Sequence, residues 1–213
     1  MKSISHYQAV IFDFDGVLAE SMDVKTEAFR QLFQPYGQDI VDKIVHHHVT
    51  NGGISRYTKI QYYYEHYLNK AITEQELNAI AQDFSSLVVD KVIASPWVPG
   101  VKEYLENNYS TQDFYVVSGT PQGELDLVIQ KRHMKKYFKE VHGTPATKPK
   151  LITQILTTHQ YQPETALYIG DSYSDYQAAH QTHIPFLGRV VDTTHAMFPP
   201  EVPTISDFFD VLK

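Results

Sequence analysis

Four short apolar segments, each followed by a turn that contains glycine, place the strongest limit on the fold of this chain. They cover residues 8–13, 113–117, 165–169 and 184–187. Their apolar and β-branched composition is typical of strands that are covered on both faces. Segments with helical hydrophobic spacing lie beside them, for example residues 101–105 and 151–156. This alternation predicts an α/β fold with a Rossmann-like, parallel open sheet.

The chain between the first two predicted strands is far longer than the dozen or so residues that a simple crossover needs. From residue 20 to residue 95 the apolar residues recur with helical spacing, for example at Ile60, Tyr63 and Tyr67. The sequence therefore predicts two domains. Residues 1–19 and 96–213 form the α/β core, and residues 20–95 form an inserted all-helical cap.

Composition and charge exclude several classes of protein. With 18 Lys and Arg against 25 Asp and Glu, the net charge is −7, so we expect no nucleic-acid partner. The absence of cysteine excludes disulfides, thiolate zinc sites and cysteine nucleophiles, and it fits a reducing cytoplasm. The apolar run before Asp13 covers only residues 9–12, so we expect neither a signal peptide nor a membrane partner. The expected location is cytoplasmic.

Acidic and hydroxyl residues follow the predicted strands, at the edge where an open α/β sheet binds its ligands. They are Asp13, Asp15, Ser118, Asp171 and Asp175. Taken alone, the segment Asp13-Phe14-Asp15-Gly16 could equally be a strand end with a tight turn. A calcium loop of the EF-hand type is excluded, because it needs a third acidic ligand before the glycine and a helix on both sides.

Two further segments could hold an anion. Ser118, Gly119 and Thr120 follow the second predicted strand, and we expect Thr120 to cap a helix with Pro121 in its first turn. Hydroxyl and free N–H groups at this point would bind an anion, although a Thr-Pro cap needs no function. Lys148 precedes another predicted helix, where a solvated surface lysine is the usual expectation.

Asp171 and Asp175 are four residues apart, which would place them on one face of a helix that begins near Ser172. Two like charges in this arrangement repel each other unless a cation lies between them. Ligands that offer only oxygen, with a phosphate nearby, suit Mg²⁺ better than zinc. The sequence therefore predicts Mg²⁺ as the cofactor.

Together these segments resemble the haloacid dehalogenase-like (HAD) superfamily, in the branch with a helical cap after the first strand that is similar to β-phosphoglucomutase and phosphoglycolate phosphatase. All four family motifs occur in order. They are Asp13-Phe14-Asp15-Gly16-Val17-Leu18, Ser118, Lys148 and Gly170-Asp171-Ser172-Tyr173-Ser174-Asp175. The resemblance covers essentially the whole chain, and each motif lies at a predicted strand end or helix start.

The resemblance implies a role for each motif. Asp13 would be the nucleophile that receives the phosphoryl group, and Asp15 the acid and base. Mg²⁺ would be held by Asp13, Asp171, Asp175 and the main-chain carbonyl of Asp15. Lys148 and Ser118, with Gly119 and Thr120, would hold the transferring oxygens. Lys150 is an alternative for this role. We prefer Lys148, because the spacing of Lys148 from the Gly-Thr-Pro segment fits the branch better.

Arg56 is the cap residue that we expect to contact substrate. In similar enzymes a glycine-containing cap segment that ends in arginine holds the distal end of the substrate, and a guanidinium suits carboxylate or phosphate. The alternative is a solvated arginine on a helix surface. The cap lysines Lys25 and Lys59 leave open phosphonate hydrolysis, in which a lysine forms a Schiff base with the substrate. The three histidines at 46–48 are not expected to bind metal, because consecutive helical residues point about 100° apart.

The function predicted from these observations is a Mg²⁺-dependent phosphatase of a small phosphorylated metabolite, with a sugar phosphate as the first choice. The catalytic intermediate would be an aspartyl-phosphate. A phosphomutase of the β-phosphoglucomutase type is the alternative within enzymes, and a phospho-Asp signalling or binding module is the alternative of another class. A monomer or a homodimer is expected. The motifs alone do not separate phosphatase from phosphomutase.

Overall fold

The structure is a computed structural model that describes residues 4–191 and 197–211. Within these residues, six parallel strands form one sheet in the order β3-β2-β1-β4-β5-β6. Their bounds are β1 (Ala9–Phe12), β2 (Asp113–Pro121), β3 (Glu140–Thr144), β4 (Ala166–Gly170), β5 (Phe186–Arg189) and β6 (Thr204–Ile205). The predicted α/β class with a parallel sheet is confirmed.

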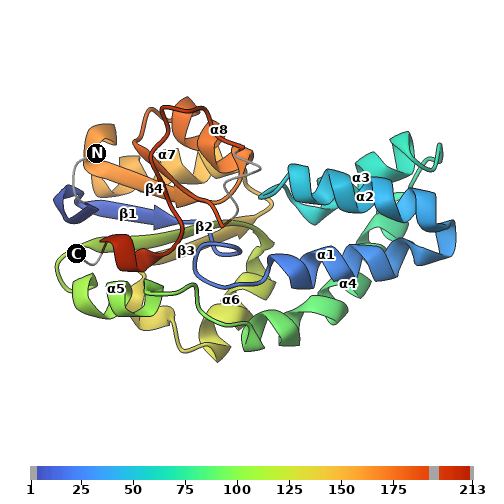
Figure 1. Cartoon of the computed structure of the whole chain (residues 1–213), viewed down its shortest axis with the longest axis horizontal. Coiled ribbons are helices and arrows are strands. Elements are labelled where there is room, and N and C mark those ends of the chain that lie inside the picture. The colour runs from blue at the N-terminus through green and yellow to red at the C-terminus, as the bar shows by residue number, and fades with distance from the viewer. Residues whose placement is uncertain (1–3, 192–196, 212–213) are drawn as a thin grey trace.

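The strands are buried on both faces, as their composition predicts. In β1, Val10 and Phe12 belong to the apolar core shared with α5 (Val101–Asn108) and α6 (Gln122–Lys131). The alternate residues, Ala9 and Ile11, belong to the core shared with α7 (Lys148–His159) and α8 (Tyr173–Gln181). Figure 1 shows these two pairs of helices on opposite sides of the sheet. The two-residue period of a strand thus supplies both cores.

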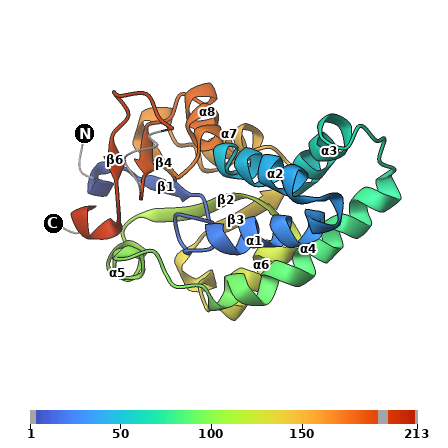
Figure 2. The ribbon, with the colours of Figure 1, turned by 45° about the vertical axis from the view of Figure 1, so that its right-hand side comes forward.

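The segment between β1 and β2 is helical, as predicted. It contains α1 (Met22–Phe33), α2 (Gln38–Thr50), α3 (Arg56–His66) and α4 (Glu74–Ala94). Buried aromatic rings join these helices: the ring of Phe29 lies 4.6 Å from that of Phe84 and 5.6 Å from that of Tyr63. Figures 1 and 2 show the four helices as a group beyond the end of the sheet toward which β1 points.

The two connections between this helical group and the sheet lie side by side. The amide of Glu20 donates to the carbonyl of Pro96 at 2.9 Å, and Ala19 forms an antiparallel bridge with Trp97. This pairing supports a boundary at these positions. The division into a core of residues 1–19 and 96–213 and a cap of residues 20–95 remains our proposal.

One detail of the prediction is wrong. Thr120 does not cap α6, because β2 continues as far as Pro121, which is itself the residue before the helix. The regular register between β2 and β3 breaks between Val117 and Pro121. The strand therefore carries Ser118, Gly119 and Thr120 past the regular ladder and toward the cap.

Candidate active site

Asp13 directly follows β1 and is held by the main chain around it. Its amide donates to the carbonyl of Ile169 at 2.9 Å, which continues the pairing of β1 with β4. Its Oδ1 accepts a hydrogen bond of 2.8 Å from the amide of Phe14. The side chain is buried, so the carboxylate is fixed at the carboxyl end of the central strand. A nucleophile benefits from such fixed placement.

Lys148, the first residue of α7, lies within the site and is buried. Its ammonium nitrogen is 3.1 Å from Oδ2 of Asp13 and 2.5 Å from Oδ1 of Asp175. Burial alone would lower the pKa of Lys148, but these two carboxylates outweigh burial and raise it. Lys150 is exposed. The geometry therefore favours Lys148 over Lys150, and the interpretation of Lys148 as a solvated surface residue is wrong.

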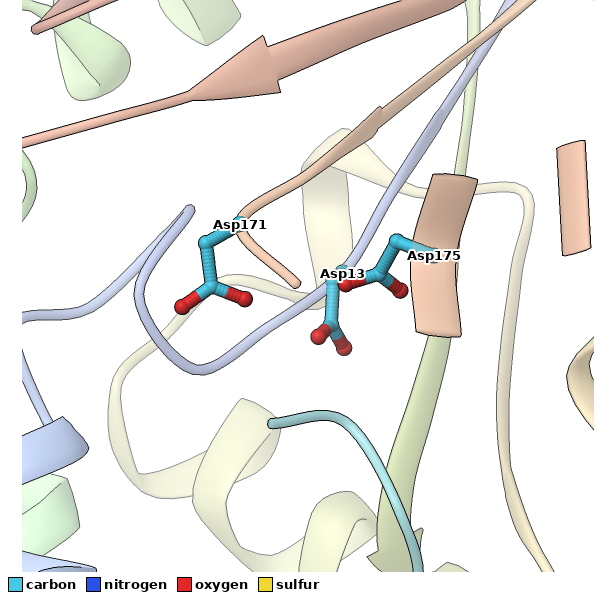
Figure 3. A group of neighbouring side chains, drawn as sticks. All are labelled: Asp13, Asp171 and Asp175. Carbon is cyan, nitrogen blue, oxygen red and sulfur yellow. The ribbon is translucent and has the colours of Figure 1, made fainter. Parts of the chain in front are cut away.

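Asp13, Asp171 and Asp175 each offer a carboxylate oxygen within 4.8 Å of the others (Figure 3). Asp171 and Asp175 do not share a helix face, although their four-residue spacing predicts that they would. Asp171 lies between β4 and α8, with Ser172 as the helix cap and Asp175 inside the first turn. Ser172 and Asp175 form a capping box, in which each side chain accepts from the main-chain amide of the other. The strand end, and not the helix, brings Asp171 to the cluster.

The electrostatics of this cluster fit a divalent cation. Burial raises the pKa of Asp13 to about 7, with Asp175 and Asp15 adding to the effect and Lys148 opposing it. Burial also raises the pKa of Asp171 well above its ordinary value, and the neighbouring Asp175 and Asp13 raise it further. A cation among these groups would relieve the repulsion, and three carboxylates suit Mg²⁺.

Asp175 has further partners besides its place in this cluster. Its Oδ1 accepts from Lys148 and, at 2.7 Å, from the hydroxyl of Tyr168. Its Oδ2 accepts from the side chain and the amide of Ser172. An ionised carboxylate has about four acceptor positions, and here each is used. Asp175 would contact a metal only by giving up one of these bonds, whereas Asp13 and Asp171 have fewer competing donors.

Asp15 faces the cap. Its Oδ1 accepts from Ser21 at 2.6 Å, and its Oδ2 accepts from Thr120 at 3.2 Å and forms an ion pair with Lys25 of α1. Burial would raise the pKa of Asp15, but the Lys25 ammonium and these hydrogen bonds lower it below its ordinary value. The Thr120 hydroxyl therefore serves the site and not the helix end.

Ser118 and Gly119 complete the floor of the site. Ser118 is buried, and its hydroxyl oxygen accepts from the amide of Thr120 at 3.1 Å. A Cβ on Gly119 would lie 2.6 Å from the carbonyl oxygen of Gly53, in the loop that precedes α3. The absence of a side chain at Gly119 lets the cap loop approach the strand.

Arg56 lines a cavity together with Asp13, Asp15 and Asp171, but its charge is already paired. Its side chain is 4% exposed, with one nitrogen 2.6 Å from Glu124 and another 2.6 Å from Ser85. The alternative of a solvated surface arginine is therefore wrong. The cavity is lined by Asp13, Asp15, Met22, Lys25, Phe29, His48, Gly53, Ile54, Arg56, Lys59, Phe84, Ser118, Gly119, Thr120 and Asp171.

Several side chains of the site are not assigned to it by the motifs. Glu124 holds Arg56, Tyr168 holds Asp175, and His48 and Lys59 line the cavity. Of the contacts in the site, only the capping box of Ser172 and Asp175 has a local sequence signal, the pattern Ser-x-x-Asp. The other contacts join helices and strands that are distant in the chain, and no local pattern marks them.

A family model described as haloacid dehalogenase-like hydrolase matches residues 10–189. The chain belongs to this family. Phosphoglycolate phosphatase from Synechococcus elongatus is 22% identical over 179 residues, which cover 82% of this chain and 79% of that protein. A phosphorylated carbohydrates phosphatase from Thermotoga maritima is 25% identical over 202 residues, covering 89% of this chain and 87% of the other.

Solved structures of low sequence identity share the fold of this HAD-family chain. β-Phosphoglucomutase from Clostridium difficile superposes with a TM-score of 0.76 at 18% identity, covering 94% of this chain and 91% of that one. The resemblance inferred from the four motifs is confirmed, and so is the expectation of an enzyme, a phosphatase of the HAD type. Among the described residues, no helix has the length and apolar character needed to cross a bilayer.

Proposed function

We propose that this HAD-family protein is a Mg²⁺-dependent phosphatase of a small phosphorylated metabolite that acts through a phosphoryl group carried on Asp13. The observation that supports this most directly is the position of Asp13. Its buried carboxylate lies beside Lys148, within the acidic cluster, and at the wall of a cavity that the cap covers. This arrangement allows an anionic nucleophile to approach an anionic phosphate.

Mg²⁺ would be held by Asp13 and Asp171, with Asp175 and the main-chain carbonyl of Asp15 as further oxygens, and it would neutralise charge on the phosphate. An oxygen of Asp13 forms a bond to phosphorus while the bond from phosphorus to the leaving oxygen breaks. Lys148 stabilises the charge on the transferring oxygens and restrains Asp13. Water then attacks the aspartyl-phosphate, and inorganic phosphate leaves.

Asp15 would give a proton to the leaving oxygen and later take one from the attacking water. In the free protein Lys25 favours the ionised form of Asp15. A substrate phosphate that draws the Lys25 ammonium toward itself would weaken this ion pair and raise the pKa of Asp15. Substrate binding would thus prepare Asp15 to carry the proton that the first step needs.

The size of the substrate follows from the cap. Residues from α1 to α4, including Phe29, Ile54 and Phe84, form the side of the cavity opposite the sheet. A covered cavity of this kind admits a small molecule and excludes a folded phosphoprotein. The names of the two curated relatives, which refer to phosphoglycolate and phosphorylated carbohydrates, support a small phosphorylated acid or sugar. We also propose a cytoplasmic monomer or homodimer.

The test is phosphate release from a panel of small phosphate esters by the purified protein. We expect turnover with Mg²⁺, none in excess chelator, and recovery when Mg²⁺ is returned. With an activated aryl phosphate, Asp15→Asn should accumulate one phosphoryl group on Asp13, detected by intact mass, and Asp13→Asn should carry none. Asp39→Asn, on an exposed position of α2, is the matched control and should behave as the wild type.

Three outcomes would contradict the proposal. Full turnover in chelator would exclude the metal-dependent mechanism. Conversion of a hexose monophosphate to its isomer, with little inorganic phosphate, would show a phosphomutase. Labelling of Asp13 without turnover of any ester would indicate a phospho-Asp signalling module.

A further inference from the structure

Three cationic side chains from the cap line the cavity: Lys25, Arg56 and Lys59. Two of them are neutralised within the protein, because Lys25 pairs with Asp15 and Arg56 pairs with Glu124. Lys59 is different. Among residues 4–191 and 197–211 its ammonium has no ion pair, and its hydrogen-bond partners are both on His48, with Nδ1 at 2.9 Å and the carbonyl oxygen at 3.2 Å.

This unpaired lysine lies in an unfavourable place for a charge. Its residue is 2% exposed. The pKa of Lys59 is lowered to about 7, chiefly by burial and also by repulsion from Lys25 and Lys148, with the attraction of Asp171 opposing them. A methionine would fill the same space without desolvating a charge. The fold alone therefore gives no reason for a lysine at this position.

His48 adds a second donor beside Lys59. An ammonium group only donates, so Nδ1 of His48 accepts and the ring hydrogen lies on Nε2. Burial lowers the pKa of His48 to about 2, with Lys59 adding to the effect, so the ring is neutral. Its Nε2 is buried and has no hydrogen-bond partner among the described residues. A buried N–H without an acceptor is unfavourable unless a ligand supplies one.

The charge of Lys59 favours a carboxylate over a phosphate as the group that it binds. A phosphate dianion carries nearly two negative charges, whereas a carboxylate carries one, which matches the single uncompensated ammonium. In the proposed function the transferring phosphate already has Lys148, Ser118, Lys25 and the metal ligands as partners. The group that faces Lys59 is therefore a different part of the substrate.

We propose that the substrate is the phosphate ester of a small hydroxy acid, a sugar acid included, and that Lys59 binds its carboxylate. This inference rests on the proposed phosphatase function and specifies its substrate class. Lys59 would donate to one carboxylate oxygen, and His48, which lines the same cavity, carries the second N–H, which has no acceptor among the described residues. Substrate binding would then provide the ion pair that the free protein lacks.

The test compares two pairs of probes. 3-Phosphoglycerate and glycerol 3-phosphate differ in a carboxylate against a hydroxymethyl group. For the wild type we expect kcat/KM to be at least about tenfold higher for the acid, the ratio that one well-placed ion pair gives. Fructose 1,6-bisphosphate and fructose 6-phosphate test a second phosphate in the same way, and a preference for the bisphosphate would overturn the carboxylate assignment.

Lys59→Met should remove the preference for the acid, mainly through KM, and should raise the melting temperature of the free protein because a buried charge is lost. Lys43→Met, on an exposed position of α2, should retain the preference. If Lys59 is only structural, Lys59→Met will lower the melting temperature and leave the preference intact. If Lys59→Met does not fold, Lys59→Gln provides the same comparison.

Different results would contradict the role of Lys59 and the proposed phosphatase function. Equal hydrolysis of the acid and neutral esters by the wild type would overturn the role of Lys59 and leave the phosphatase function standing. No hydrolysis of any ester, aryl phosphates included, would overturn the proposed function itself.

Discussion

The hydroxyl of Tyr168, in β4, donates a hydrogen bond of 2.7 Å to Oδ1 of Asp175. The same oxygen accepts from Lys148 at 2.5 Å, so the tyrosine fixes the carboxylate that in turn fixes the lysine beside Asp13. Tyr168, in an inner strand, thereby helps to position Lys148 at the carboxyl ends of the strands. This relationship makes Tyr168 a positioning residue.

Tyr168→Phe removes that hydrogen bond and retains the ring. Because the acceptor is charged, we expect the free energy of unfolding to fall by about 1.5–3 kcal/mol. We also expect a lower kcat, because Asp175 and Lys148 lose part of their alignment. Urea unfolding and steady-state phosphate release measure the two effects.

Tyr115→Phe is the control for that variant. Tyr115 lies in β2 within the same apolar core, and its hydroxyl is 3.0 Å from the hydroxyl of Tyr161, away from the acidic cluster. It should lose stability without a change in kcat. An equal fall in kcat for both variants would show that Tyr168 acts only through general stability.

Lys148→Met should abolish most of the activity. The substitution removes the cation that balances Asp13 and Asp175 and that would stabilise the transferring oxygens. Loss of one such group lowers kcat by about 10²–10³-fold. Lys150→Met changes an exposed residue two positions away and should retain activity. Activity that is lost in Lys150→Met and kept in Lys148→Met would reverse the assignment.

The parallel sheet and the helical insertion could be predicted because they follow from local patterns. Apolar β-branched segments, such as residues 165–169, carry their own signal, and the motif aspartates lie where those strands end. The contacts of Asp15 with Lys25 and of Arg56 with Glu124 could not be predicted in this way. Each depends on how a cap helix is packed against the sheet or its helices, and no spacing in the sequence encodes that packing.

The error at Thr120 has a similar origin. A threonine before a proline is a common helix start, and that local preference predicts a cap. In the structure the strand continues through Thr120, and the Thr120 hydroxyl donates to Asp15, which is distant in the chain. At Thr120 the local preference for a helix cap is therefore outweighed by contacts with residues that are distant in the chain.

His48 gives the protein a specific sensitivity to acid. Burial lowers its pKa in the folded state to about 2, whereas an unfolded histidine has a pKa near 6.5. Its neutral form therefore contributes stability above about pH 6.5, and this contribution is lost as the pH falls below that value toward 2. Between pH 6 and 4 the wild type should lose stability more steeply than His48→Gln, by up to about 1.4 kcal/mol per pH unit.

Urea unfolding at several pH values measures this slope. His46→Gln, at an exposed position on the same helix, is the control and should keep the wild-type slope. Lys59 does not confuse the comparison, because its lowered pKa of about 7 lies above this range and the ammonium is charged throughout it. Identical slopes for the wild type and His48→Gln would show that His48 is protonated in the folded protein.

Gly16 tests the metal site without changing an acidic residue. It follows the Asp13-Phe14-Asp15 segment with a φ of 73°, and an added Cβ would lie 2.1 Å from Oδ2 of Asp171. Gly16→Ala must therefore displace the Asp171 carboxylate as well as strain the main chain. Gly37 provides the matched control, because its φ is 93° and an added Cβ would meet no atom of the described residues within 4 Å.

Both Gly16→Ala and Gly37→Ala should lose about 1–3 kcal/mol of stability, since each places a side chain at a positive φ that favours glycine. Only Gly16→Ala should respond weakly to Mg²⁺. A ligand at 100 times its dissociation constant stabilises the protein to which it binds by about 2.7 kcal/mol, so Mg²⁺ should raise the melting temperature of the wild type and of Gly37→Ala. Displacement of Asp171 removes a ligand and should reduce that increase in Gly16→Ala. An undiminished Mg²⁺ response in Gly16→Ala would show that the ion is bound without Asp171, since the steric conflict at Gly16 leaves the other carboxylates of the cluster in place.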